Sequence, residues 1–244
     1  VQYHWSNGIY SVYKPGEEVH EVRASVLDIL PTVYKLAGVP LPDGIQGKPI
    51  MDRVNDTFIL NNEKYLKSFE IIKNTFRNFP NDQIAVAVSG GKDSTVVMYM
   101  AWLVNKNVKG IFVDTTAHFK ATYYFVNELI QGYGMNIYYS KSDDRYVAFG
   151  VDKVNCCRVN KIENLNLTLR NLNIKFLLTG IRRSDGGGRE NEEVSTVRKT
   201  EDGYEYVQIN PILDWTEDEV RDFLMAEGIP INPLYYNGYR SIDC

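Results

Sequence analysis

From residue 84 onward, short and almost wholly apolar runs alternate with stretches that have helical spacing. The apolar runs are residues 84–89, 109–115, 135–140 and 174–180. The helical stretches between them are residues 94–104, 120–134 and 156–172. Strands that are apolar on both faces, separated by helices, are typical of a parallel sheet covered on both sides. The sequence therefore predicts an α/β protein with a Rossmann-like, mostly parallel sheet and helices on both faces. A capping box formed by Thr216 and Glu219 predicts one further helix, which ends at Gly228.

The first part of the chain has a different character. Residues 1–54 hold five of the nine prolines, which indicates a turn-rich segment, with one helix predicted over residues 25–36. An amphipathic helix is predicted over residues 57–79. Its apolar positions recur at helical spacing: Leu66, Phe69, Ile72 and Phe76. We therefore expect a small N-terminal appendage over residues 1–54 and a main domain over residues 55–244.

Composition limits the class of partner. The chain has 244 residues, a net charge of −4 and three cysteines. This charge gives no reason to expect a nucleic acid or an anionic membrane as partner. We recognise neither a run of the roughly 20 apolar residues that span a bilayer nor a signal peptide at the start. A small and odd number of cysteines argues against a disulfide framework and favours a reducing compartment, so we expect a cytoplasmic protein. Association into a homo-oligomer stays open.

The loop between the first apolar run and the following helix is unusually rich in small and charged residues. It consists of Ser89, Gly90, Gly91, Lys92, Asp93 and Ser94. A loop after a parallel strand lies at the carboxyl edge of the sheet, where open α/β folds bind ligands. The free N–H groups and the dipole of the following helix favour an anion there. A glycine-rich structural turn is the alternative, and the spacing does not match the Walker A pattern.

This loop resembles the pyrophosphate-loop motif of the adenine-nucleotide α-hydrolase superfamily. That superfamily includes N-type ATP pyrophosphatases, the small subunit of sulfate adenylyltransferase, tRNA-thiolating enzymes, and the adenylylsulfate and phosphoadenylylsulfate reductases. Four further segments, which begin at Val113, Cys156, Thr179 and Ile209, resemble the reductases in particular. The match depends on their combination and covers about residues 57–244. Departures from the family pattern are Thr116, Lys120, Ala121, Asn160 and Asn164.

The resemblance implies a substrate that is an adenine nucleotide carrying a phosphosulfate. Its reacting end is densely anionic, and guanidinium groups bind such anions through paired charged hydrogen bonds. Two adjacent arginines follow the apolar run 174–180, at the same predicted sheet edge as the glycine loop. A solvated basic loop is the alternative. Besides the six loop residues, we expect the following residues to bind substrate: Asp114, Arg182, Arg183, Arg189 and Arg240.

The cysteines are the sharpest test of the resemblance. Cys156 and Cys157 are adjacent, and Cys244 is the last residue of the sequence. In the family, such a pair and a later Cys-x-x-Cys hold a four-iron iron–sulfur cluster, and Cys244 matches the start of that second motif. The resemblance thus implies a cluster with an incomplete ligand set, with Lys161 next to its ligands, and no flavin or nicotinamide. Three buried thiols, or a zinc site that includes His118, are the alternatives.

The resemblance also implies a mechanism and a partner. In these reductases a cysteine on a C-terminal tail attacks the sulfur of the phosphosulfate, and thioredoxin or a similar dithiol then frees sulfite. We expect that nucleophilic cysteine to lie beyond the end of this chain. Nucleotidyl transfer, tRNA thiolation and a nucleotide-binding module without catalysis remain as alternatives. The neutral-to-acidic composition speaks against the RNA-binding alternative.

Residues 1–54 resemble something else. They are similar to the C-terminal end of phosphodiesterases and phosphatases of the alkaline-phosphatase superfamily. The match lies in the segment from Asp28 to Thr32 and in residues 38–50, with His4 at the place of a metal-binding histidine. The other metal ligands of that family are absent, so we expect a non-catalytic appendage.

Overall fold

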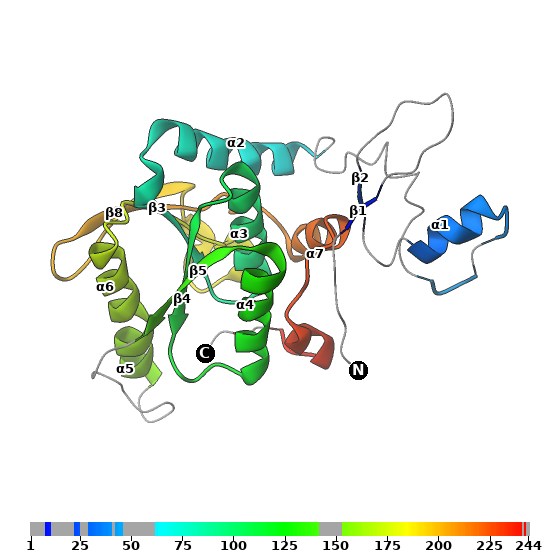
Figure 1. Cartoon of the computed structure of the whole chain (residues 1–244). Helices are drawn as coiled ribbons and strands as arrows, with labels where there is room; N and C mark the ends of the chain where they lie inside the picture. The colour runs from blue at the N-terminus through cyan, green and yellow to red at the C-terminus, as the bar shows by residue number, and fades with distance from the viewer. Residues whose placement is uncertain are drawn as a thin grey trace. The chain divides into compact units, whose positions relative to one another are not determined.

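The computed structural model describes residues 8–10, 22–24, 29–40, 42–45, 62–141, 153–240 and 242 (Figure 1). The chain divides into two compact units, Lys64–Arg221 with Ile231–Cys244, and Val1–Glu63 with Asp222–Pro230. Within the described ranges, no helix is both long and apolar enough to cross a membrane.

The larger unit is built around a six-stranded sheet with the strand order β5-β4-β3-β6-β8-β7. All neighbouring strands are parallel except β7, which runs antiparallel to β8. This confirms the predicted mostly parallel sheet. The strands are β3 (Ile84–Val88), β4 (Lys109–Asp114), β5 (Asn136–Lys141), β6 (Phe176–Leu178), β7 (Ser195–Lys199) and β8 (Glu205–Ile209). Because β3 has β4 on one side and β6 on the other, the order reverses at β3, and open sheets bind ligands at such a point.

Helices precede, connect or follow these strands, and the last of them, α7, extends into the smaller unit. They are α2 (Glu63–Asn78), α3 (Lys92–Val104), α4 (Lys120–Tyr133), α5 (Lys153–Cys157), the π-helical η4 (Arg158–Glu163), α6 (Asn164–Asn171) and α7 (Glu217–Ala226). Short 3₁₀ segments are η3 (Asn81–Gln83), η5 (Arg183–Asp185), η6 (Arg189–Asn191) and η7 (Pro233–Asn237). The stretch predicted as one helix from Cys156 is thus a continuous helical segment that contains a π turn.

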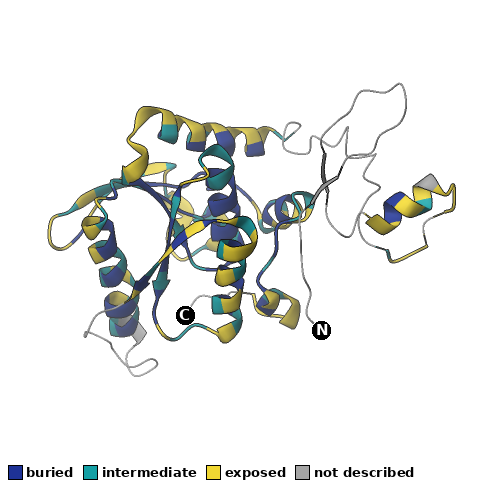
Figure 2. Ribbon diagram, viewed as in Figure 1, coloured by how far each residue is buried: buried dark blue, intermediate teal, exposed yellow. Residues whose placement is uncertain are grey.

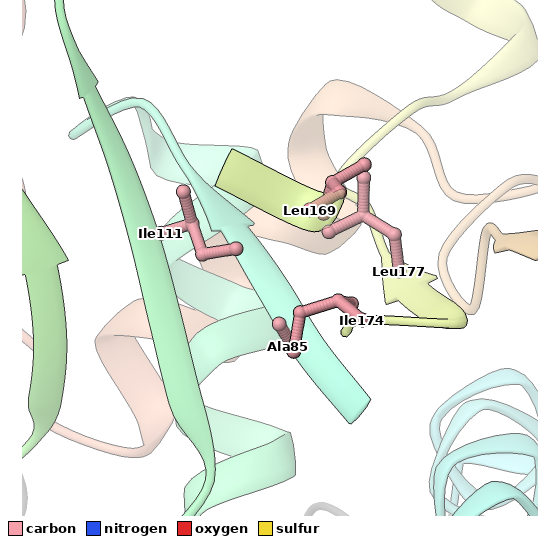
Figure 3. Close-up of a cluster of buried hydrophobic side chains, with 5 residues drawn as sticks. All are labelled: Ala85, Ile111, Leu169, Ile174 and Leu177. Atoms are coloured by element: carbon pink, nitrogen blue, oxygen red, sulfur yellow. The ribbon is translucent and has the colours of Figure 1, made fainter. Parts of the chain in front are cut away.

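Packing shows which helix covers which face. Leu169 of α6 meets Ala85, Ile111 and Leu177 of three neighbouring strands in a buried cluster (Figure 3). The next residue along β4, Gly110, faces α3, since a Cβ added there would lie 3.1 Å from the sulfur of Met98. Successive residues of a strand point to opposite faces, so α6 and α3 cover opposite sides of the sheet. The central strands β3 and β4 are therefore buried along most of their length (Figure 2).

The antiparallel edge of the sheet was not anticipated from the sequence. Strands β7 and β8 form a hairpin in which Ser195 pairs with Ile209 and Lys199 with Glu205. Its loop contains Asp202 and Gly203, and Gly203 has a φ of 84°. An Asp-Gly pair between alternating segments is a hairpin signal. Residues of β7 alternate between exposed and half-buried positions, so this edge strand lacks the apolar run that marks the central strands.

Helix α2 corresponds to the helix predicted over residues 57–79, of which residues 57–61 lie outside the described part. The prediction of its apolar face was wrong at Leu66, which is 37% exposed. Tyr65 takes that place, because its ring lies 4.5 Å from the ring of Trp215 and its hydroxyl donates to the carbonyl of Glu219. The buried face of α2 consists of Tyr65, Ser68, Phe69, Ile72 and Thr75.

Three described elements lie wholly in the smaller unit, which also contains the C-terminal half of α7. Strands β1 (Gly8–Tyr10) and β2 (Val22–Ala24) pair antiparallel, and α1 spans Ile29–Leu36. The helix was predicted to start at residue 25, but residues 25–28 lie outside the described ranges. The same holds for His4 and for residues 46–61. The predicted domain boundary at residues 54 and 55 therefore stays a prediction.

Candidate functional site

The loop after β3 joins strand to helix as predicted, but it is shorter than expected. Helix α3 begins at Lys92, so only Ser89, Gly90 and Gly91 lie outside regular structure. The Ser94 hydroxyl donates to the carbonyl of Gly91 at 2.9 Å and accepts the backbone N–H of Ser89 at 3.1 Å. These two hydrogen bonds of Ser94 hold the loop against the first turn of α3.

Position 90 requires a glycine, both for its backbone conformation and for the small space around it. Its φ is 77°, which residues with a Cβ rarely adopt. A Cβ added there would lie 2.7 Å from the Cγ2 atom of Thr122 in α4. Its carbonyl accepts a hydrogen bond from the amide of Asn232, which is fully buried. The turn is therefore held from two sides, by α4 and by the segment before η7.

The loop after β6 packs directly on the start of α3. A Cβ added at Gly180 would lie 2.7 Å from the backbone carbon of Asp93 and 2.7 Å from the nitrogen of Ser94. Only a glycine allows this close approach without a shift of the backbone. The approach brings Arg182, two residues further on, to the first turn of α3.

Two buried cations meet at this place. The side chains of Lys92 and Arg182 are only 7% and 4% exposed. The Nζ atom of Lys92 lies 3.2 Å from Asp93 Oδ2 and 3.2 Å from Glu217 Oε2. The Nη2 atom of Arg182 lies 2.8 Å from Asp185 Oδ1 and 3.2 Å from the same Glu217 oxygen. We call these five residues, Lys92, Asp93, Arg182, Asp185 and Glu217, the cation network.

Burial and charge set the protonation of the network. Burial alone would lower the pKa of Lys92, but the charge of Asp93 and the Tyr235 and Glu217 side chains outweigh it and raise this pKa. Burial raises the pKa of Asp93, against the opposing charges of Lys92 and Arg182. Burial would also raise the pKa of Glu217, yet the hydrogen bond and charge of Lys92, with the charge of Arg182, lower it. Lys92 therefore stays charged at neutral pH.

Not all the arginines predicted as ligands belong to the network. Arg189 reaches its edge, with Nη1 3.2 Å from Asp185 Oδ2. Arg183 instead pairs with Asp214 and donates to the carbonyl of Glu192 at 2.9 Å. Arg240 is exposed and makes no ion pair with the residues of the cation network. The structure thus brings Arg182 and Lys92 together and directs Arg183 to a different partner.

Asp114 lies at the carboxyl end of β4, next to β3 in the sheet. It is buried, and its Oδ1 atom accepts the hydroxyl of Tyr123 at 2.5 Å and the backbone N–H of Thr116 at 2.9 Å. Burial, together with the hydrogen bond to Asp114, raises the pKa of Tyr123. Thr116 has a φ of 60° and stands where the reductases that this sequence resembles have a glycine. The departure seen in the sequence therefore leaves a β-branched residue in a left-handed conformation.

The cysteine pair lies on the helical segment between β5 and β6. Cys156 is buried, Cys157 is half-buried, and both are free thiols. The amide of Asn160 donates to the sulfur of Cys156 at 3.4 Å. Lys161 lies one turn on, within the π turn η4, and is half-buried. Among the described residues, no three His, Cys, Asp or Glu side chains gather as metal ligands, and Cys244 lies outside these residues.

His118, the alternative metal ligand, has other contacts. Its Nε2 atom lies 2.9 Å from the carbonyl of Val113, and its ring lies against Phe112 and Tyr123. It therefore contributes to the packing at the end of β4.

Two residues near the loop were missed in the sequence. Glu217 was interpreted only as part of a helix start, although an acidic residue after the cap at Thr216 was visible. The hydroxyl of Tyr235 accepts the backbone N–H of Lys92 at 3.3 Å, and its ring centroid lies 5.2 Å from the ammonium nitrogen. Tyr235 comes from η7, more than a hundred residues away along the chain, and no local pattern could link it to the loop.

Comparison with known proteins identifies relatives of this chain. The family model "Phosphoadenosine phosphosulfate reductase domain" matches residues 83–244. The adenosine 5'-phosphosulfate reductase of Mesorhizobium japonicum is 30% identical over 190 residues, which cover 74% of this chain and 72% of that protein. The phosphoadenosine 5'-phosphosulfate reductase of Xanthomonas campestris is 31% identical over 173 residues, which cover 66% and 69%.

A solved structure shares the fold. The phosphoadenylyl-sulfate reductase from Candida auris superposes with a TM-score of 0.60 at 23% identity, covering 84% of this chain and 96% of that chain. The family model covers most of the chain, and these two reductases share about 30% of their residues with it over more than two thirds of their own length. The chain belongs to the phosphoadenosine phosphosulfate reductase domain family, a family of oxidoreductases.

Proposed function

We propose that this chain binds the phosphosulfate end of an adenylyl sulfate at the cation network and takes part in its reduction to sulfite. The observation that carries the proposal is the meeting of Lys92 and Arg182, two buried cations from different strand ends, at the N-terminus of α3. Buried cations that converge on a helix start favour a multiply charged anion. The family relationship supports the choice of a phosphosulfate among such anions.

The reaction that we propose has two steps. A cysteine thiolate attacks the sulfur of the phosphosulfate, so that a sulfur–sulfur bond forms and the bond from sulfur to the phosphate oxygen breaks. The nucleotide leaves with that oxygen. One thiolate of a thioredoxin-type dithiol then attacks the cysteine sulfur, so that a mixed disulfide forms and sulfite departs with the electron pair of the broken sulfur–sulfur bond. The second thiolate of the dithiol breaks the mixed disulfide, which frees the cysteine and leaves the dithiol as a disulfide. Lys92 and Arg182, the two cations of the network, neutralise the phosphate oxygens and orient the sulfur, and no described residue is assigned as the nucleophile.

The iron–sulfur cluster is a separate proposal. Clusters of the four-iron type are held by four cysteine thiolates, and the described residues supply two, Cys156 and Cys157. Their adjacent positions and the polar contact from Asn160 to Cys156 are compatible with ligation, but the donor set is incomplete. Cys244 is proposed as a third ligand. The proposed reaction therefore has no step at a cluster, and it uses no flavin or nicotinamide.

Two assays test the proposed function. The first measures sulfite released from adenylyl sulfate and from its 3′-phosphorylated form, with reduced thioredoxin as donor. The second measures the binding of both nucleotides by calorimetry, which needs no nucleophile. Binding without sulfite supports the anion site and assigns no nucleophile to this chain, and release of pyrophosphate from ATP in a parallel assay supports the nucleotidyl-transfer alternative. Absence of binding by either sulfated nucleotide contradicts the proposed site.

The free thiols of Cys156 and Cys157 also support a location for this activity. We propose a reducing compartment such as the cytoplasm, because unpaired thiols persist there.

A further inference from the structure

One carboxylate oxygen contacts both buried cations of the network. The Oε2 atom of Glu217 lies 3.2 Å from Lys92 Nζ and 3.2 Å from Arg182 Nη2. An oxygen of a phosphate or sulfate group that binds these cations needs the same two donors. Glu217 therefore takes, with a side chain of the protein itself, the contacts that an anionic ligand requires.

The three carboxylates of the network differ in how they are held. Asp93 follows Lys92 directly in the chain, and Asp185 lies in the 3₁₀ turn η5, of which Arg182 is the N-cap. These two are fixed beside their cations and are 21% and 20% exposed. Glu217 comes from a separate element, α7, and its side chain is 44% exposed. Of the three, only Glu217 can leave the cations by a rotation of its side chain into solvent.

A second partner is available to Glu217 on its outer side. The Oε1 atom of Glu217 accepts a hydrogen bond from Arg221 Nη2 at 3.1 Å, one helical turn further along α7. Arg221 is 57% exposed and is therefore accessible to a carboxylate that has turned outward. Glutamate and arginine four residues apart form a favourable pair on a helix surface.

Two anions cannot share these donors at low cost. A phosphate oxygen bound to Lys92 and Arg182 would lie within a few ångströms of the Glu217 carboxylate, and like charges at such distances repel strongly away from bulk water. Binding of the ligand therefore requires that Glu217 turn away or take up a proton.

We propose that Glu217 is a displaceable internal anion, a positioning residue that holds Lys92 and Arg182 in place and yields them to the anionic end of the substrate, with Arg221 as its outer partner. This inference rests on the proposed function, since it concerns the same cations. It adds that the affinity for anions is set by competition with a side chain of α7. A purely structural role of Glu217 makes the opposite prediction, because its loss would then disorder the cations and weaken binding.

The test is the affinity for inorganic pyrophosphate, measured by calorimetry at low ionic strength. Glu217→Gln keeps the shape of the side chain and removes the competing charge, so we expect pyrophosphate to bind about three- to tenfold more tightly. Asp218→Asn is the matched control, because it removes the same charge from the next, exposed residue of α7. We expect it to change the affinity by less than about twofold, as is typical of exposed charges.

A variant of Arg221 tests the same proposal in the opposite direction. Arg221→Gln removes the outer partner, so Glu217 stays on the cations and pyrophosphate binds more weakly, by about twofold or more. In the Glu217→Gln background the same change has no further effect. Should Glu217→Gln fold poorly in a thermal melt, Glu217→Asp retracts the carboxylate by one methylene and gives an intermediate gain.

The results distinguish a failure of the proposed role of Glu217 from a failure of the proposed anion site. Unchanged or weaker binding by Glu217→Gln, with normal binding by the wild type, overturns the role of Glu217 and leaves the proposed site intact. An equal gain in Asp218→Asn overturns it as well, since the effect would then be one of general charge. Absence of pyrophosphate binding in the wild type and all variants contradicts the proposed anion site itself, and this inference with it.

Discussion

The Nε atom of Arg182 lies 2.7 Å from the Oδ1 atom of Asp93, although the two residues follow different strands of the sheet. The two buried atoms form an ion pair but are not aligned as a hydrogen bond. Arg182 is thereby tied to the first turn of α3, while its Nη2 atom faces Asp185 and Glu217. The guanidinium group is thus oriented before any ligand arrives, which reduces the entropy that binding costs.

The first prediction concerns the two cations of the network. Arg182→Ala and Lys92→Ala each weaken the binding of an adenylyl sulfate at least tenfold, since loss of a charged hydrogen bond costs roughly 1.5–3 kcal/mol. Calorimetry measures the affinities. Arg183→Ala is the matched control, because this adjacent arginine pairs with Asp214 instead, and its loss leaves the affinity within about twofold. Equal losses in Arg182→Ala and Arg183→Ala would show that a diffuse basic loop binds the anion.

The second prediction concerns the contact of Gly180 with α3. Gly180→Ala forces backbone apart at a contact of 2.7 Å, so the free energy of unfolding falls by about 1–3 kcal/mol and anion binding weakens. Gly132→Ala is the control, because Gly132 lies in α4 with nothing within 4 Å of an added Cβ. That substitution should raise the stability by up to about 1 kcal/mol. Thermal melts of both variants measure the effects, and a neutral Gly180→Ala would mean that this contact does not position Arg182.

The third prediction concerns the left-handed backbone of Thr116. Its φ of 60° is costly for a β-branched residue, and its side chain is exposed. Thr116→Gly should therefore stabilise the protein by about 1 kcal/mol, which raises the melting temperature by roughly 2–4 °C for a chain of this size. Thr116→Ala keeps the Cβ and should bring little of this gain. A lower melting temperature for Thr116→Gly would contradict the strain.

The fourth prediction concerns pH and the capping box of α7. Burial would raise the pKa of Glu219, but the hydrogen bond from Lys64 and the N–H of Thr216 lower it below its ordinary value of 4.5. A carboxylate with a lowered native pKa stabilises the fold fully above the unfolded pKa, and this contribution is lost as the pH falls through the native pKa. The melting temperature should therefore fall below pH 4.5 more steeply in the wild type than in Glu219→Gln. Parallel curves would exclude Glu219 as a source of acid sensitivity.

The fifth prediction tests the cluster. If Cys156 and Cys157 are ligands, protein purified without oxygen is brown and contains iron and inorganic sulfide. The double variant Cys156→Ser/Cys157→Ser then loses the iron and keeps its fold by circular dichroism. Cys244→Ser lowers the iron content if this residue is the third ligand. Iron that is unaffected by the double variant, or absent from the wild type, means that the pair holds no cluster.

Much of the fold could be predicted from local patterns. The strands β3, β4 and β6 were visible because they are mostly buried and therefore almost wholly apolar. Gly134 ends α4 with a φ of 67°, as a glycine cap predicts. The hairpin of β7 and β8 was missed because an edge strand has one solvated face and loses that apolar signature. The apolar face of α2 was misplaced at Leu66 because Trp215, which selects Tyr65 instead, lies far away along the chain.

For the site, the sequence by itself determined the chemistry that is local to the chain. It placed a glycine turn between strand and helix, a lysine at the helix start and arginines after a later strand, because each of these follows from neighbouring residues. Only the tertiary structure decided that Arg182 faces Asp93 whereas Arg183 faces Asp214. It also decided that Glu217 and Tyr235 reach Lys92. The physical reason is that the direction of a side chain and the pairing of charges depend on which elements pack together, and a local pattern does not contain that information.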